Sequence, residues 1–349
     1  MPGRLTLEAP AAPGLELEWE AGLDDHVVRA AWSPDGSRLA AALIGGPVVV
    51  FDCDGRRLLD LPGHEFGTLS LSWRADGRVL ATGGQDSRAR LWDAASGRRL
   101  HDLESGKHWV ERVAFAPFGD LLATASGRAL RLWSGAGDLL ADYAPHPSTI
   151  ADVQWQPNDL LFATAAYGQL TTFRPESPQP VKRYAWKGSI LAIAWSPDGN
   201  CIATGNQDSS VHFWYRKTGR ELEMTGYPAK VRELSWDATS RYLATGGAST
   251  VTVWDCSGKG PAGTRPIQLN GHAGRPIRAL AFQHNGPFLA SGGQDGRVCL
   301  WLPDKHTRLV RVAELPGELT QLAWAPDDRK LAAASSAGML RVFRPESGS

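Results

Sequence analysis

The sequence predicts an all-β protein built from eight copies of one small unit in a single domain. An aromatic residue closes a short apolar run every 40 to 46 residues, at Trp32, Trp73, Phe115, Trp155, Trp195, Trp236, Phe282 and Trp324. A second aromatic follows each of these after 18 or 19 residues, at Phe51, Trp92, Trp133, Phe173, Trp214, Trp254, Trp301 and Phe343. Turn-forming stretches at 33–36, 196–199 and 325–328 combine Pro, which fixes φ, with Asp and, in the first two, Gly. The period is that of a four-stranded propeller blade.

Two stretches carry the repeat most completely. One begins with Gly63-His64 and ends with Trp92-Asp93, and the other runs from Gly271-His272 to Trp301. In these residues the chain resembles the WD40-repeat family. The resemblance covers nearly the whole chain and implies a β-propeller in which each repeat gives the outer strand of one blade and the three inner strands of the next. We therefore expect a single eight-bladed WD40-type β-propeller.

The elements follow from this register. Residues 1–14 are expected to form a flexible tail, and 15–349 the propeller. Each blade should contain four strands, as at 27–32, 38–43, 47–51 and 56–61. The last repeat stops after its third strand, 340–343, and lacks an outer strand. Residues 15–19 alternate apolar and charged side chains with the period of a half-buried strand. We expect them to close the ring by pairing with the last blade.

Composition narrows the function classes. The chain has 37 basic and 37 acidic residues, so its overall charge favours neither nucleic acid nor an anionic membrane. Arg pairs at 56–57 and 98–99 start outer strands, but acidic residues follow them, as expected of protected sheet edges. No apolar run has the length of a membrane helix and the start does not resemble a secretion signal, so we expect a cytoplasmic protein. The 29 Arg against 8 Lys are associated with a GC-rich, prokaryotic genome.

Two sets of polar residues match the hydrogen-bonded tetrad of WD40 blades. They are His64, Thr82, Asp86 and Trp92 in one repeat, and His272, Ser291, Asp295 and Trp301 in another. A buried imidazole needs partners for both nitrogens, which the carboxylate and the hydroxyl can supply. Similar residues also form hydrolase triads. Because the set occurs twice, we interpret both as structural and expect no catalytic residue. The four scattered cysteines suggest neither disulfides nor metal, and we expect no metal and no cofactor.

Function is expected on the upper face, which the resemblance places at the loops entering each innermost strand and the turns between second and third strands. By register, residues three and four before each first aromatic face this side, and nearby loops add aromatic residues. The predicted partner-binding set is Arg29, Phe66, Trp109, Glu111, Arg112, Asp152, Tyr167, Tyr227, Arg232, Glu233, Arg278 and Gln321. Aromatic and Arg side chains supply most interface energy. The long loop at 257–266 on the opposite face is an alternative site.

The leading interpretation is therefore a non-enzymatic scaffold, monomeric or part of a hetero-complex, that binds a protein or peptide and no membrane. Two alternatives stay open. One is a propeller enzyme of the quinone-dependent dehydrogenase type, which is expected to be exported and to bind Ca²⁺. The other is a subunit of a nucleic-acid-modifying complex, whose affinity for DNA or RNA would fall steeply with salt.

Overall fold

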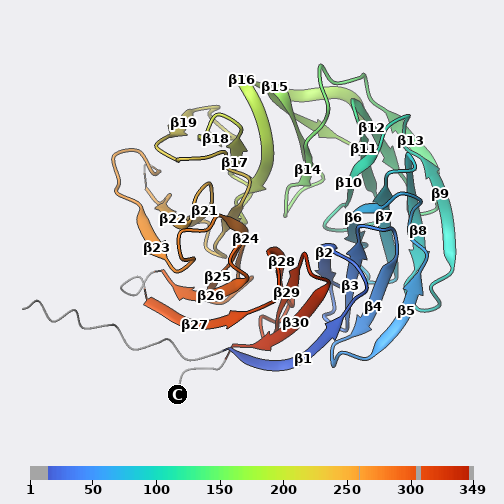
Figure 1. Cartoon of the computed structure of the whole chain (residues 1–349). Helices are drawn as coiled ribbons and strands as arrows, with labels where there is room; N and C mark the ends of the chain where they lie inside the picture. Colours follow the sequence, from blue (N-terminus) through green and yellow to red (C-terminus); the bar gives the residue numbers. More distant parts are fainter. Residues whose placement is uncertain (1–14, 259, 304–307, 346–349) are drawn as a thin grey trace, which may run out of the picture.

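The computed structural model describes residues 15–258, 260–303 and 308–345, and these residues form a ring of radial β-sheets around a central axis (Figure 1). The expected tail at 1–14 lies outside the described residues. Every regular element in the described part of the chain is a strand, and none of it forms a helix long and apolar enough to cross a membrane. The all-β prediction is confirmed.

Five sheets have four antiparallel strands in chain order, with the first strand nearest the centre of the ring. The first three are β2 (Val27–Trp32), β3 (Arg38–Leu43), β4 (Val48–Asp52), β5 (Arg57–Leu61); β6 (Thr68–Trp73), β7 (Val79–Gly84), β8 (Arg88–Asp93), β9 (Arg99–Glu104); and β10 (Val110–Phe115), β11 (Leu122–Ser126), β12 (Ala129–Trp133), β13 (Leu139–Asp142). The other two are β20 (Leu234–Trp236), β21 (Tyr242–Thr245), β22 (Thr250–Asp255), β23 (Ile267–Asn270); and β24 (Ile277–Phe282), β25 (Leu289–Gly293), β26 (Arg297–Leu302), β27 (Arg308–Glu314).

The prediction of eight separate blades is wrong. One sheet has six strands, β14 (Asp152–Trp155), β15 (Phe162–Arg174), β16 (Ser177–Trp195), β17 (Cys201–Asn206), β18 (Val211–Tyr215) and β19 (Glu221–Met224). Counted as hydrogen-bonded sheets, the described residues form seven blades. The physical reason is β16, a 19-residue strand whose first part pairs with β15 and whose last part pairs with β17. The fourth and fifth sequence repeats therefore share one sheet.

The N-terminal strand closes the ring. The seventh sheet consists of β28 (Leu319–Trp324), β29 (Leu331–Ser335), β30 (Met339–Arg344) and β1 (Glu16–Gly22), with β1 at its outer edge. The antiparallel register runs from Glu16 opposite Arg344 to Gly22 opposite Met339. The ring of Trp19 packs on Phe51 of the next sheet, with 5.6 Å between centroids, and its indole N–H donates to the Cys53 carbonyl at 3.1 Å. The predicted closure is thus observed.

The first aromatic column connects neighbouring inner strands. In six repeats the Trp indole N–H donates to a backbone carbonyl of the preceding inner strand, as from Trp73 to Ala31 at 3.0 Å; the others are Trp32 to Ala323, Trp155 to Ala114, Trp195 to Gln154, Trp236 to Ala194 and Trp324 to Ala281, at 2.9–3.2 Å. Phe115 and Phe282 have no indole. There the backbone N–H of the Phe donates instead to the hydroxyl of Ser72 or Ser235, at 3.0 and 2.9 Å. The residue before each of these aromatics is Ala or Ser in seven of the eight repeats, and such small side chains suit the close contact between neighbouring inner strands.

Candidate interaction surface

The first predicted tetrad lies within the sheet β6–β9. The His64 Nδ1 is 2.8 Å from an Asp86 carboxylate oxygen, and its Nε2 is 2.8 Å from the Thr82 hydroxyl. The Trp92 indole N–H donates to the same hydroxyl at 2.9 Å. Burial lowers the pKa of His64, although Asp86 acts in the opposite direction. The imidazole is thus held neutral with both nitrogens satisfied.

The second tetrad repeats this geometry in the sheet β24–β27. His272 lies 3.1 Å from Asp295 and 2.8 Å from the Ser291 hydroxyl, which accepts the Trp301 indole N–H at 2.8 Å. A nucleophilic Ser must be reached by a substrate, but Ser291 is fully buried. Both sets are therefore built as packing elements within a blade.

Other repeats keep parts of the tetrad with different residues. In the sheet β20–β23, the Tyr227 hydroxyl lies 2.8 Å from Thr245 and accepts the Trp254 indole N–H at 2.7 Å. Tyr227 is a member of the predicted partner-binding set, yet the structure places its hydroxyl inside the blade. Sequence spacing could have indicated this, because Tyr227 precedes Thr245 by 18 residues and His64 precedes Thr82 by 18.

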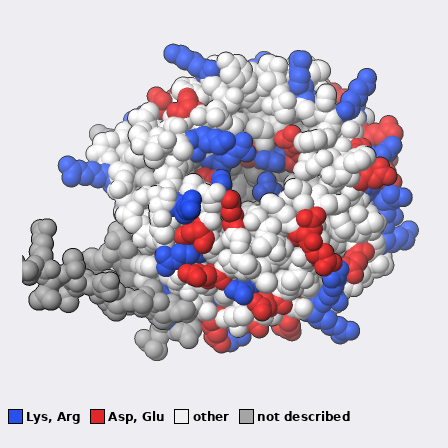
Figure 2. All heavy atoms as spheres, in the orientation of Figure 1, with Lys and Arg blue, Asp and Glu red and all other residues white. Residues whose placement is uncertain are grey.

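Seven of the predicted partner-binding residues meet at the centre of the ring. They line one cavity of about 670 Å³ and are Arg29, Arg112, Asp152, Arg232, Glu233, Arg278 and Gln321. Most lie on the innermost strands β2, β10, β14, β24 and β28, while Arg232 and Glu233 directly precede β20. Figure 2 shows a hollow at this position with basic side chains around it. Seven of the positions chosen from the repeat register therefore line the central cavity.

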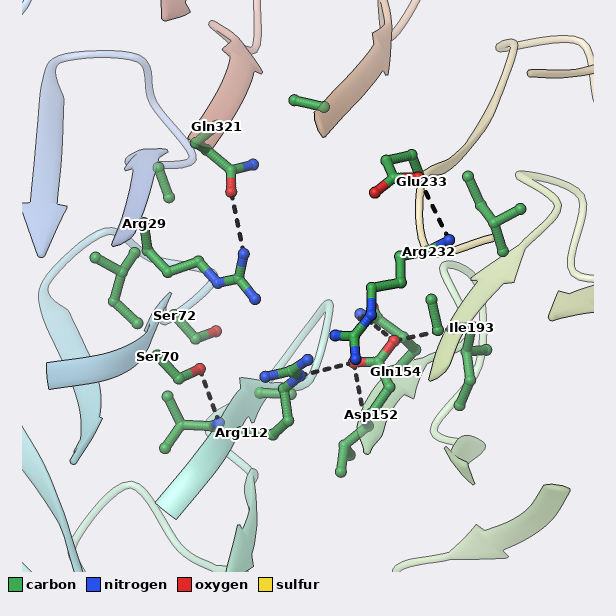
Figure 3. Close-up of a pocket in the computed structure, with 18 of the residues that line it drawn as sticks. Arg29, Ser70, Ser72, Arg112, Asp152, Gln154, Ile193, Arg232, Glu233 and Gln321 are labelled. Atoms are coloured by element: carbon green, nitrogen blue, oxygen red, sulfur yellow. Dashed lines mark hydrogen bonds and ion pairs between the residues drawn. The ribbon is translucent and has the colours of Figure 1, made fainter. Parts of the chain in front are cut away.

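Two arginines of this cavity have no acidic partner among the residues that the structure describes. The Arg29 guanidinium donates only to the Gln321 side chain among the described residues, at 3.4 Å, and burial followed by the nearby Arg112 lowers its pKa to about 10. The Arg232 guanidinium has no hydrogen bond or ion pair to any described residue. Arg29, Arg112 and Arg232 all extend toward the middle of the cavity (Figure 3). Their mutual repulsion favours an anionic group between them.

The remaining charges of the cavity are held in place. Arg112 is paired with Asp152 at 3.1 Å, and the second oxygen of Asp152 accepts the Ile193 backbone N–H at 2.9 Å. Arg278 is paired with Glu318 at 3.2 Å. Burial raises the pKa of Glu233. The cavity therefore offers free positive charge more than free negative charge.

Gln154 is a cavity residue that the sequence reasoning missed. It directly precedes Trp155, a position where the seven other repeats have Ala or Ser. Its exposed side chain lies in the cavity beside Asp152 (Figure 3). The hydroxyls of Ser70 and Ser72 also line the cavity, but they accept backbone N–H groups of β10 at 3.1 and 3.0 Å.

Three predicted aromatics stand exposed on the surrounding loops. The exposed fractions are 78% for Phe66, 53% for Trp109 and 57% for Tyr167, and we call these three the rim aromatics. They lie in the loops before β6 and β10 and in the bend within β15, so they follow consecutive repeats around one part of the ring. Ile44, also exposed and not predicted, lies in the turn between β3 and β4. Glu111 is half-buried beside Arg112 and does not line the cavity.

The rim loops are fixed by backbone hydrogen bonds. The Gln85 N–H donates to the Gly67 carbonyl at 3.0 Å, and the Tyr167 N–H donates to the Ser148 hydroxyl at 2.8 Å. Phe66 itself has a φ of 64°, a left-handed backbone that is unfavourable for a bulky residue. The fold thus holds an exposed aromatic in a strained conformation, as is common at binding sites.

No group of three His, Cys, Asp or Glu side chains that could hold a metal occurs among the described residues. The four cysteines are free thiols, and burial raises the pKa of each. The outer-strand arginines Arg57 and Arg99 pair with Asp60 and Asp102 of their own strands.

Comparison with known families agrees with this architecture. The profile of the family described as "IFT122 first beta-propeller" matches residues 26–258, and that of "WD domain, G-beta repeat" matches residues 263–301. The chain belongs to the WD40-repeat β-propeller family. A crystal structure of the computationally designed Ika8 protein aligns with a TM-score of 0.82 and 22% identity, over 95% of this chain and all of that one. That likeness shows the fold alone.

Similar curated proteins are WD40 relatives at low identity. Arabidopsis thaliana "Cell division cycle 20.5, cofactor of APC complex" is 23% identical over 83% of this chain and 66% of its own length. Arabidopsis "THO complex subunit 3" is 24% identical over 82% of this chain and 94% of its own length. Rice "Pre-mRNA-processing factor 19" is 24% identical over 79% of this chain, which spans only 55% of that protein. These relatives are plant proteins, so they do not support the expected prokaryotic origin.

Proposed function

We propose that this WD40 chain is a non-enzymatic scaffold that binds a protein or peptide partner on its upper face. The observation that carries the proposal is the rim aromatics beside a cavity with two arginines that have no acidic partner in the described part of the chain. Exposed aromatic and Arg side chains are the residues that most often dominate interface energy. The rest of the upper face supplies mixed charges, which suit a peptide carrying both signs.

The partner's chemistry follows from the two parts of the surface. The rim aromatics favour apolar side chains, since Phe66 and Trp109 have large exposed ring areas. Arg232 and Arg29 favour an acidic side chain that enters the cavity. A peptide that lies across the upper face and inserts one acidic residue satisfies both requirements.

The names of the relatives support a partner-binding role, since they describe an APC cofactor and a THO complex subunit. The tetrad hydroxyls of Thr82 and Ser291 are fully buried, which supports a structural role for them. We propose a cytoplasmic protein that is monomeric or part of a hetero-complex and uses neither cofactor nor metal.

The test compares two faces of the ring with matched double variants. Peptides are first selected by display on the wild-type chain, and their Kd is then measured by fluorescence polarisation. We expect Trp109→Ala with Arg232→Ala to weaken binding at least about tenfold, because one hot-spot truncation commonly costs 2 kcal/mol or more. The control is Phe118→Ala with Arg329→Ala, which removes an exposed aromatic and an exposed Arg from turns on the opposite face.

Unchanged binding by the control and weakened binding by the upper-face variant would support the proposal. Equal binding by both variants, or a larger loss in the control, would show that the working surface lies elsewhere. The loop at 257–266, described here except for residue 259, would then be the next candidate.

A further inference from the structure

The third and outer strands of three sheets carry a recurring ion pair. Two residues before the second aromatic, an Arg faces an acidic residue on the outer strand: Arg90 with Asp102 at 2.8 Å, Arg131 with Asp142 at 3.0 Å and Arg341 with Glu20 at 2.8 Å. Each Arg also donates a hydrogen bond to a backbone carbonyl: Arg90 to that of Gly63, Arg131 to that of Glu104 and Arg341 to that of Glu314. The long Arg side chain thus covers this part of the blade.

The corresponding pair in β15 and β16 is different. Thr171 occupies the Arg position, and the residue opposite it is Arg183. Arg183 therefore stands where the other sheets have the acidic residue, and the short Thr171 stands where they have the long Arg. Arg183 is exposed, and its guanidinium has no hydrogen bond or ion pair to any described residue. At this position the sheet carries the positive charge of Arg183, whereas three other sheets carry an Arg–carboxylate pair without net charge.

The tetrad of this repeat is also incomplete. His146 keeps the contact of its Nε2 with the Thr164 hydroxyl at 2.8 Å. Tyr167-Gly168 stand where β6–β9 has its Asp turn, and Phe173 replaces Trp92. Consequently the Nδ1 of His146 and the hydroxyl of Thr171 are buried without a hydrogen-bond partner. The His146 side chain is only 4% exposed, so an orphaned nitrogen at this depth is unusual.

The missing side chains leave a cavity of about 330 Å³ beside the loop 143–151 of the upper face. His146, Thr171 and Arg183 contribute to its wall, and so do Phe173 and four prolines, Pro145, Pro147, Pro178 and Pro180. The side chains of Gln169 and Gln179 line it too, so the lining combines a cation and several polar groups with rigid apolar surface. Its size is at the lower end of pockets that hold small ligands.

We propose that this cavity binds a carboxylate on a small apolar body, with the carboxylate occupying the place against His146 that Asp86 occupies against His64. With its proton on Nδ1, the neutral imidazole donates to one carboxylate oxygen. The Thr171 hydroxyl and the Arg183 guanidinium are placed to donate to the ligand as well. The prolines and Phe173 contact the apolar part. The same chemistry could come from a free small acid or from an acidic side chain of a bound peptide.

The experiment observes His146 directly. The full chain is labelled with ¹⁵N-histidine, and its imidazole nitrogens are followed by NMR during titration with pentanoate, with its neutral counterpart pentanamide, or with the peptide acetyl-Ala-Glu-Ala-amide. We expect a saturable shift of the His146 nitrogens with a carboxylate probe and at least about fivefold weaker binding of pentanamide. Tighter binding of pentanoate indicates a small acid, and tighter binding of the peptide indicates an acidic side chain.

Two variants sharpen this test. Arg183→Gln should weaken carboxylate binding about tenfold, because a charge-assisted hydrogen bond is lost. Arg99→Gln, a change of an exposed outer-strand Arg in another sheet, should bind like wild type.

The proposal is overturned if neither carboxylate probe gives a saturable shift of His146. It is also overturned if pentanamide binds as well as pentanoate, or if Arg183→Gln, whose exposed position should leave folding intact, binds like the wild type.

Discussion

The sheet β6–β9 and the β14–β16 part of the six-stranded sheet are built on the same strand pattern but differ in their polar groups. In the first, His64 has partners on both nitrogens, and Arg90 contacts both Asp86 and Asp102 at 2.8 Å. In the second, His146 has one partner and no Arg or Asp completes the set. The comparison teaches that the apolar packing is sufficient to form the strands, and that the polar network is an additional stabilising element, which the β14–β16 part of the chain lacks.

The largest loss of stability is expected when a whole strand is deleted. Deleting residues 1–22 removes β1 and exposes the edge of β30, together with the apolar surface under Trp19. We expect aggregation or loss of cooperative melting, measured by calorimetry and size-exclusion chromatography. Deleting residues 1–12 removes no part of β1 and should leave the melting transition nearly unchanged. Similar behaviour of the two truncations would contradict the closure by β1.

We expect the protein to lose stability in acid because of His146, the buried histidine of the incomplete tetrad. Burial, and then Arg183, lowers the pKa of His146 to about 4 from 6.5. Because the folded-state pKa is below the unfolded one, stability is fully present above about pH 6.5 and is lost as the pH falls toward 4. Each pKa unit corresponds to about 1.4 kcal/mol, so the loss between pH 7.5 and 5 is about 2 kcal/mol.

Urea unfolding at pH 7.5 and 5 measures this difference. His146→Gln should lose less stability than wild type over the interval, by about 2 kcal/mol. The other buried histidines titrate in both proteins and cancel in the comparison. An identical pH dependence in the two proteins would rule out His146 as the source.

Breaking a complete tetrad should have a clear effect of its own. Asp86→Ala leaves the His64 imidazole without its carboxylate and should cost about 1–3 kcal/mol in the free energy of unfolding. Asp295→Ala should behave alike, since it removes the same contact from His272. Asp208→Ala is the matched control, because Asp208 contacts the Ser210 hydroxyl at 2.7 Å and no histidine. Equal losses at all three positions in chemical denaturation would contradict the role given to the tetrads.

The smallest effect is expected on the binding surface. Trp109 and Arg232 lie outside the core and outside the tetrads, so the double alanine variant should change stability by about 1 kcal/mol or less. In a chain of this size that corresponds to a shift in Tm of about 2–4 °C. A thermal shift assay checks this, and a much larger shift would mean that these side chains support the fold.

The sequence was most informative where one residue type recurs at fixed spacing. The aromatic columns located the inner strands, the alternation at 15–19 located the closing strand, and the resemblance to WD40 repeats identified both tetrads. Register also located the arginines of the central cavity, because a position on an inner strand determines which side of the ring it faces.

Other features depended on structure that no short pattern encodes. Whether β16 continues between two repeats depends on backbone pairing, such as Tyr167 opposite Ser189, and not on a turn residue. Tyr227 was predicted to be an exposed loop aromatic. Its place in a tetrad was not recognised, because WD40 repeats carry His at that position and Tyr227 replaces it. The cavity beside His146 lies where Thr171 and Phe173 are shorter than Arg90 and Trp92, and its walls depend on how four prolines of neighbouring segments pack, which the replacements alone do not determine.

The most direct test of the account compares the ring nitrogens of His64, His272 and His146 in one ¹⁵N-histidine spectrum of the wild-type chain. We expect His64 and His272 to carry a slowly exchanging proton on Nδ1, since each lies against a buried carboxylate. His146 should lack a slowly exchanging Nδ1 proton. A protected Nδ1 proton on all three histidines would contradict the claim that one repeat has an orphaned imidazole in place of a complete network.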